Sequence, residues 1–236
     1  MLFRSKVNTP GHMSHSTTRR ITAGGVYNLT PGAHHSLSNA LVSNYFDNND
    51  QFKRYGVHED GSCFFHTICA AKNINDYRNR THEERAKIGR QFRKKIRKRV
   101  SKQNWDSIWK RRGVTQSKGR LPEVETIKHM LGNHTTWADV YIILYVMDKI
   151  NINMLFFDLS SDSIYCGVRG LEAGNQDSIL VAWVNRAHFE PIFRKHETDS
   201  DMDMFLYPST DPFVKRIMAR YDSELCKHTN DITDII

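Results

Sequence analysis

Apolar positions follow two different patterns along the chain, and the change comes near residue 150. Before it, Ile88, Phe92, Ile96 and Val100 recur every four residues, which is typical of one face of a helix. After it, short apolar runs rich in β-branched and aromatic residues predict strands. These runs are 152–157, 163–168, 179–184 and 188–193. Helices first and strands later indicate an α+β fold with a small, mainly antiparallel sheet flanked by helices.

Turn and cap residues predict where further helices begin. One helix should open at Cys63 and run to about Lys72, and a short one should surround Trp105. A third is predicted after Thr135 or Thr136, either of which can serve as its cap. Its expected buried face comprises Trp137, Val140, Tyr141, Leu144 and Met147. A last helix is capped by Asp211 and opened by Pro212. That helix either docks on the domain or binds a partner, and the sequence does not decide between the two.

Composition divides the 236 residues into three parts. Residues 1–40 are polar and lack periodicity, so we expect a mobile arm. Residues 41–195 carry the patterned segments and should form one globular domain, and 196–236 should form an acidic loop and the last helix. No apolar run reaches membrane-spanning length, and the first twenty residues lack the apolar segment of a signal peptide. With only four cysteines and no C-x-x-C, we expect free thiols in a reducing cytoplasm.

The net charge of +8 comes from one segment. Residues 85–120 hold fifteen Lys or Arg and a single acid, Asp106. Such a run is typical of a nucleic-acid patch or a nuclear-import signal, and equally of the solvated face of an amphipathic helix. Nucleic acid is therefore one possible partner through 85–120, and nuclear entry is a second possible consequence.

The stretch EDGSCFFHTICAA contains a candidate nucleophile, Cys63. A helix N-terminus favours a thiolate, and backbone amides beside it can stabilise an oxyanion. Gly61 and Ser62 would form that oxyanion loop, with Gly61 permitting an unusual backbone and the Cys63 amide pointing out of the helix start. Cys63 with His66 lacks a second pair of zinc ligands, so no metal is expected.

A candidate base lies far along the chain, at His188. It follows the tight link 185–187, so its side chain can be aimed from the end of a strand. Glu190 lies two residues further on and points to the same face, where it could hold the imidazole in one tautomer.

Together these segments resemble the three motifs of the ovarian-tumour (OTU) family of cysteine proteases, most of which are deubiquitinases. The first motif, D-G-[NS]-C-[FL]-[FY], is matched by residues 60–65. The middle motif, a Trp that opens a helix leading into a core strand, is matched by 137–139 and the later INMLFF. The last motif, an apolar strand, a short link and H-[YF]-[NDE], is matched by ILVAWV, 185–187 and 188–190. The motifs stand in the family's order over roughly residues 50–195.

The resemblance implies a papain-like OTU fold with a catalytic cysteine at a helix N-terminus. Cys63 would be the nucleophile and His188 its general base and acid, cleaving isopeptide bonds at the ubiquitin C-terminus without metal or cofactor. The implied partners are ubiquitin, polyubiquitin chains or ubiquitin-like modifiers. The family often has Asn or Asp where this chain has Glu190, and some members use an acid upstream of the cysteine. Asp60 is that alternative, and we favour Glu190.

Two other functions remain open at this level. The protein could bind nucleic acid through 85–120 with an inactive OTU-like domain, or bind ubiquitin without cleaving it. An economical OTU-like domain with unusual flanks would suit a virus or an intracellular microbe, in which case the expected location is the host cytoplasm.

Overall fold

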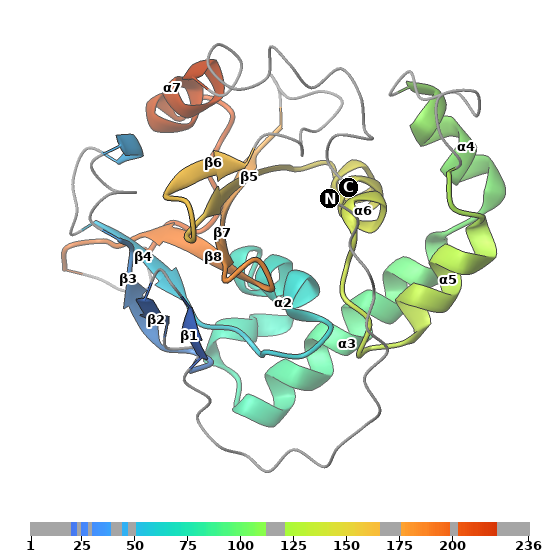
Figure 1. Ribbon diagram of the computed structural model, residues 1–236, viewed down its shortest axis with the longest axis horizontal. Helices are drawn as coiled ribbons and strands as arrows, with labels where there is room; N and C mark the ends of the chain where they lie inside the picture. The colour runs from blue at the N-terminus through green and yellow to red at the C-terminus, as the bar shows by residue number, and fades with distance from the viewer. Residues whose placement is uncertain are drawn as a thin grey trace.

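A mixed sheet of six strands lies at the centre of the protein (Figure 1). The computed structural model describes residues 20–22, 25–27, 30–38, 44–46, 51–111, 121–165, 176–198 and 203–220. In the order in which they lie side by side, the strands are β3 (His34–Ser36), β4 (Phe52–Tyr55), β8 (His188–Arg194), β7 (Ser178–Val184), β5 (Asn153–Asp158) and β6 (Ser163–Tyr165). Four of the five neighbouring pairs are antiparallel, and β5 with β7 is the parallel one. The predicted α+β class and mainly antiparallel sheet are confirmed.

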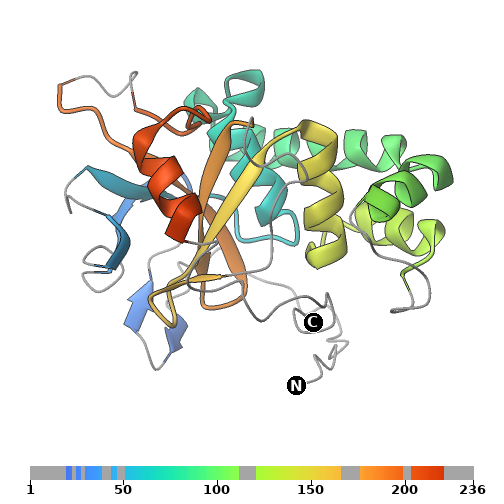
Figure 2. The same ribbon diagram turned by 90° about the horizontal axis from the view of Figure 1, so that it is seen from above.

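Helices cover both faces of this sheet (Figures 1 and 2). The larger group on one face consists of α2 (Cys63–Ala71), the 3-10 helix η1 (Ile74–Asn79), α3 (His82–Arg99), α4 (Lys102–Arg111), α5 (Val124–Gly132) and α6 (Val140–Ile150). On the opposite face lies α7 (Pro212–Arg220). No helix within the described ranges is long and apolar enough to cross a membrane.

The alternation of side chains along the central strands builds two separate cores. Met154 and Phe156 of β5 point into the core formed with α2 to α6. Leu155 and Phe157 point the other way, into the core closed by α7. Because both faces of β5 and β7 are buried, these strands appear in the sequence as continuous apolar runs.

The structure answers the question left open for the last helix. Asp211 Oδ1 accepts hydrogen bonds from the amides of Phe213 and Val214, at 2.9 and 3.1 Å, so the predicted cap is confirmed. Phe213 and Ile217 are buried in the second core. The described part of α7 therefore docks on the sheet, and the remaining predicted contact residues, 221 and 225, lie outside the described ranges.

Two details of the predicted third helix were wrong. α6 begins at Val140, and its cap is Asp139, whose Oδ1 accepts the Ile142 amide at 2.8 Å. Thr135 is engaged elsewhere, because both its amide and its hydroxyl donate to Asn133 Oδ1. Trp137 precedes the helix and is 48% exposed, so it does not belong to the buried face.

Order also extends into segments where no element was predicted. β3 comes from the polar region 1–40 and pairs with β4, and β1 (Arg20–Thr22) pairs with β2 (Gly25–Tyr27) in a separate small sheet. Helix α5 was likewise not predicted. Segments as short as β3 carry too few residues to show a period, so their strand state depends on a partner supplied by the rest of the fold.

Candidate active site

Cys63 is the first residue of α2 and is only 3% exposed. The turn before it is held by the side chain of Asp60, whose Oδ1 accepts a hydrogen bond from the Ser62 amide at 2.8 Å. The Cys63 amide donates to the Asp60 carbonyl at 3.1 Å. The expectation that the Cys63 amide points freely out of the helix start is therefore wrong.

Gly61 serves close packing, which differs from the expected unusual backbone. The φ angle of Gly61 is not positive. Among the glycines of the described ranges, positive φ is found at Gly32. A Cβ at Gly61 would lie 2.3 Å from the carbonyl carbon of Thr135 and 2.5 Å from the oxygen of His134. Only glycine lets the nucleophile loop, residues 60–62, pack this closely on the 133–136 loop.

His188 is the first residue of β8 and faces the start of α2 through the packing of the two elements. The link from β7 turns through Asn185 and Arg186, which both have positive φ. Thr67 of α2 donates its hydroxyl to the Phe189 carbonyl at 2.8 Å. The rings of Phe64 and Phe189 also meet edge to face, with centroids 6.0 Å apart. These contacts bring Cys63 and His188 together across 125 positions of sequence.

Glu190 lies beside His188, as the alternation of β8 predicted. Its Oε1 is 3.5 Å from His188 Nε2, which is ion-pair range and long for a hydrogen bond. Its Oε2 pairs with the guanidinium of Arg54 on β4. Arg54, His188 and Glu190 are at most 3% exposed, so the carboxylate is buried between two bases. Sequence reasoning missed Arg54, because nothing in FKRY distinguishes a buried arginine from an exposed one.

The pKa of His188 is raised by its neighbours. Burial alone would lower it, but the neighbouring Cys63 thiol and the Glu190 carboxylate both favour the charged ring and raise the pKa well above the ordinary histidine value. The site therefore favours an imidazolium beside Cys63, which is the partner that a thiolate needs.

Asp60 faces a different histidine. Its carboxylate oxygens lie 3.3 and 3.4 Å from His66 Nε2, and Tyr77 Oη lies 3.1 Å from His66 Nδ1. Burial tends to raise the pKa of Asp60, but the hydrogen bond and charge of His66 and the Ser62 amide lower it overall. This geometry favours Glu190 over Asp60 as the residue that orients His188, and gives Asp60 the task of shaping the nucleophile loop.

Arg93 of α3 also holds the nucleophile loop in place. Sequence reasoning counted it among the basic residues of 85–120, yet it is 1% exposed. Its Nη1 donates to the Gly61 carbonyl at 2.6 Å. A signal was present, because Arg93 belongs to a series with three- and four-residue spacing on one helix face. The members of that series, all buried, are Ala86, Gly89, Arg93, Ile96 and Val100.

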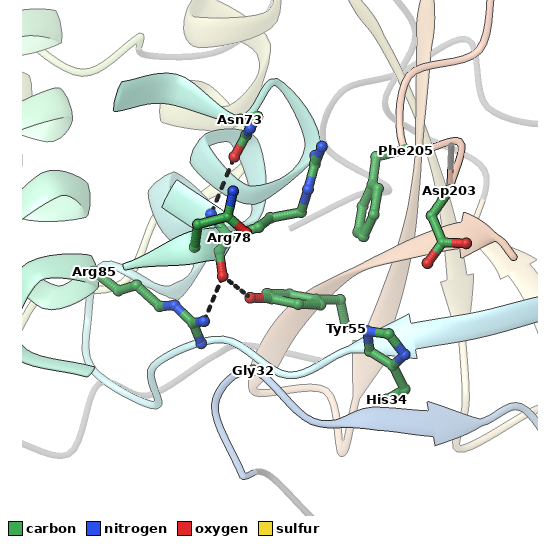
Figure 3. Close-up of a pocket in the computed structure, with 9 residues that line it drawn as sticks. Gly32, His34, Tyr55, Asn73, Arg78, Arg85, Asp203 and Phe205 are labelled. Atoms are coloured by element: carbon green, nitrogen blue, oxygen red, sulfur yellow. Dashed lines mark hydrogen bonds between the residues drawn. The ribbon is translucent and has the colours of Figure 1, made fainter. Parts of the chain in front are cut away.

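A separate pocket of about 420 Å³ lies at the other end of α2 (Figure 3). Its lining includes Arg78 and Arg85 but neither Cys63 nor His188. Arg78 Nη1 donates to the Ala70 carbonyl at 2.8 Å, and Arg85 Nη2 donates to the Arg78 carbonyl at 2.6 Å. Both arginines thus fasten the turn after α2, which explains their position without any ligand.

Within the described ranges, no group of three or more His, Cys, Asp or Glu side chains could hold a metal ion. The two cysteines that can be placed, Cys63 and Cys69, are both free thiols. Cys166 and Cys226 lie outside the described residues.

No family model and no curated protein matches the chain. Several solved structures resemble it. An ovarian tumour (OTU) domain in complex with ubiquitin aligns over 82% of this chain and 92% of that chain, with 13% identity and a TM-score of 0.47. The viral OTU domain protease of Dera Ghazi Khan virus aligns over 61% of this chain and 81% of that chain, with 16% identity and a TM-score of 0.40. The Hazara virus OTU bound to ubiquitin aligns over 61% and 81%, with 12% identity and a TM-score of 0.38. The family named by these structures is the one that the three sequence motifs resemble.

Proposed function

We propose that the protein is a thiol-dependent hydrolase that cleaves isopeptide bonds at the C-terminus of ubiquitin. The observation that carries the proposal is the buried convergence of Cys63, His188 and Glu190 from two distant segments. Buried ionisable groups are costly to fold unless paired, and their concentration at one point is typical of a reaction centre. The substrate class follows from the resemblance of the three motifs.

The reaction begins with the Cys63 thiolate. It attacks the isopeptide carbonyl carbon and forms a tetrahedral oxyanion. The His188 imidazolium then gives its proton to the departing lysine amine, and the C–N bond breaks to leave a thioester on Cys63. Water, deprotonated by neutral His188, attacks the thioester, releasing the ubiquitin carboxylate and restoring the ion pair. Glu190 keeps the imidazolium oriented and charged during the first half.

The site is closed in this structure. Cys63 and His188 are each 3% exposed, so a carbonyl can reach the sulfur only after the surrounding chain moves. The amides of Ser62 and Cys63 are also bonded to Asp60. Productive binding must therefore open the site and redirect an amide toward the oxyanion.

The test is reaction with ubiquitin that carries an electrophile at its C-terminus, read as a mass increase of the intact protein. Wild type should form a covalent adduct, and Cys63→Ala should form none. The matched control is Cys69→Ala, because Cys69 lies on the same helix and its burial raises the pKa of the thiol far above the usual range. That variant should react like wild type.

Each outcome decides something. An adduct on Cys63→Ala would mean that another thiol is the nucleophile. A folded wild type that reacts with a small alkylating agent but not with the ubiquitin electrophile would refute the substrate class and leave the thiol chemistry standing. Repeating the reaction with ubiquitin-like modifiers would then identify the class that replaces it.

A second candidate function is binding to a nucleic-acid backbone, favoured by the exposed face of α3. Lys87, Lys94, Lys95 and Lys98 are exposed there, and no ion pair joins them to an acid within the described ranges. Like charges one turn apart destabilise a helix, so helix stability does not explain the pattern. The face also lacks the exposed apolar anchors that a membrane or protein interface needs, which favours phosphate contacts.

The salt dependence of binding to single-stranded RNA and DNA tests this second function. Replacing the four lysines with Gln should flatten the slope of log K against log salt by about 3, at roughly 0.7 per lost phosphate contact. Arg93 is buried and so is removed from this surface, which corrects its earlier grouping with the basic run. Lys215→Gln on α7 is the control and should leave the slope unchanged, whereas no measurable binding by wild type would refute the function.

A further inference from the structure

Arg93 makes an unusually complete set of hydrogen bonds for a buried cation. An arginine has five N–H donors, and here each has an acceptor within reach. Nε donates to Leu131 O at 3.2 Å, and Nη2 donates to the carbonyls of Met130 and Thr136 at 2.6 Å each. Nη1 donates to Gly61 O at 2.6 Å and to Ser62 Oγ at 3.3 Å. One side chain thus joins α3, the end of α5, the 133–136 loop and the nucleophile loop.

The acceptors are carbonyls and a hydroxyl, and none is a carboxylate. Among the described residues, no acid lies within ion-pair distance of Arg93. Burial lowers the pKa of the guanidinium to about 10, and the interactions with Asp60 and Cys63 act in the opposite direction. Met130 and Leu131 are in the last turn of α5, where the helix dipole also favours a cation. A buried cation without a carboxylate partner is costly, so these acceptors and charges are needed to hold Arg93 at this position.

The contact with Gly61 fixes the peptide that precedes the nucleophile. The Gly61 carbonyl points to Arg93, and the Ser62 amide of the same planar peptide points to Asp60 Oδ1. Both ends of this peptide are therefore held. Ser62 Oγ adds a third tie, since it also lies 3.4 Å from the His134 carbonyl. Loss of the Arg93 fork would free the loop to rotate and would displace Cys63 relative to His188.

We propose that Arg93 is a positioning residue for Cys63, which holds the nucleophile loop and supplies a fixed positive charge that favours the thiolate. The inference rests on the proposed role of Cys63 as the nucleophile, but it does not depend on ubiquitin as the substrate. Lysine cannot replace it fully, because an ammonium is a point charge and lacks the planar fork that reaches three separate chain segments here.

The experiment compares wild type, Arg93→Lys and Arg93→Met in two assays. The first is the rate at which iodoacetamide alkylates Cys63 as a function of pH, located by peptide mass spectrometry in a Cys69→Ala background. The second is kcat and KM on a fluorogenic ubiquitin C-terminal conjugate. Arg93→Met should move the midpoint of the alkylation profile to higher pH and lower kcat on the order of 100-fold, with KM little changed.

Arg93→Lys separates charge from geometry. It should restore most of the alkylation profile, because the positive charge remains, and recover only part of kcat, because the fork is lost. The control is Arg80→Met just before the start of α3, an exposed arginine whose loss should change neither assay. Thermal melting of each variant shows whether it is folded at the assay temperature.

The inference fails if a folded Arg93→Lys or Arg93→Met keeps the wild-type alkylation profile and kcat. It also fails if both variants lose activity in proportion to unfolding while the folded fraction is alkylated normally. A wild type that alkylates with the expected pH profile but ignores the ubiquitin conjugate would refute the proposed substrate alone, so the two failures are distinguishable.

Discussion

At the scale of single residues, the site is organised by which charges are buried together. Glu190 is fully buried, and its two oxygens face different cations, His188 and Arg54. Arg54 holds the far oxygen of Glu190, which leaves the near oxygen facing the imidazole. Removing one partner of such a cluster leaves an uncompensated buried charge, so each member should be sensitive to substitution.

Glu190→Gln should therefore lower kcat/KM on the order of 100-fold while the protein still folds. The substitution keeps the shape of the side chain and removes its charge. Glu190 is one of the groups that raise the pKa of His188, so its loss should lower that pKa and move the alkaline limb of the pH–rate profile to lower pH. The check is the pH dependence of kcat/KM on a fluorogenic ubiquitin conjugate.

The matching variant is Asp60→Asn, which tests the alternative role. Asp60 contacts His66 and the Ser62 amide, so Asp60→Asn should disturb the nucleophile loop without moving the alkaline limb. If Asp60→Asn shifts that limb and Glu190→Gln does not, the assignment of the orienting residue is reversed.

At the scale of elements, the sequence predicts what is decided locally. The start of α2 at Cys63 follows from the turn residues directly before it. The β7–link–β8 unit follows in the same way from two apolar runs separated by a short link. The pairing of Glu190 with Arg54 and of Arg93 with Gly61 could not be predicted, because the burial of a charged side chain depends on partners supplied by distant segments. The cap of α6 was mistaken for a similar reason, since Asn133 competes for Thr135.

The contact between α2 and α3 gives a prediction at this scale, at Gly89. Helix propensity alone predicts that Gly89→Ala stabilises α3 by about 1 kcal/mol. A Cβ at this position would lie 2.1 Å from two atoms of the His66 ring, which is fully buried and held by Asp60 and Tyr77. Overpacking of this kind costs about 1–3 kcal/mol, so the net effect should be destabilising.

Urea unfolding of Gly89→Ala and wild type measures the difference directly. The control is Gly132→Ala at the end of α5, where the nearest atoms belong to the flexible side chain of Arg97, at 3.1 Å or more. A Gly89→Ala protein more stable than wild type would show that α3 can move away from His66 without loss.

At the scale of the whole molecule, a cluster of three histidines lies where the segment after β4 meets α2 and α3. His58 lies with its ring centroid 3.9 Å from that of His82 and 5.1 Å from that of His66, and its Nε2 donates to the His82 carbonyl at 2.7 Å. The cluster joins the segment that follows β4, residues 56–59, to the first turns of α2 and α3. Its charge state therefore affects how the two layers hold together.

This cluster predicts that the protein loses stability as the pH falls from about 6.5 toward 4. Burial, followed by the charges of His66 and His82, lowers the pKa of His58 to about 4, although the His82 carbonyl and Asp60 act in the opposite direction. The unfolded chain binds the proton first, so the stabilisation is complete above the unfolded pKa of about 6.5 and is lost as the pH falls through the folded value. The loss should stay below about 3.4 kcal/mol, the difference between the two pKa values converted to free energy, because solvent screening reduces the effect.

Other groups with shifted pKa values also affect stability. Some act outside the window between pH 6.5 and 4, and comparison with a His58 variant separates the others from His58. The pKa of His188 is raised on folding, so its contribution is fully present below 6.5 and declines only at higher pH. Asp60, whose pKa is lowered, loses its contribution below about 4. His34 and His35 also have lowered pKa values and act in the same direction as His58.

Urea unfolding of wild type and His58→Gln between pH 4 and 8 isolates the His58 part, because the variant should show a flatter dependence on pH. Parallel curves for the two proteins would place the acid sensitivity elsewhere than in this cluster.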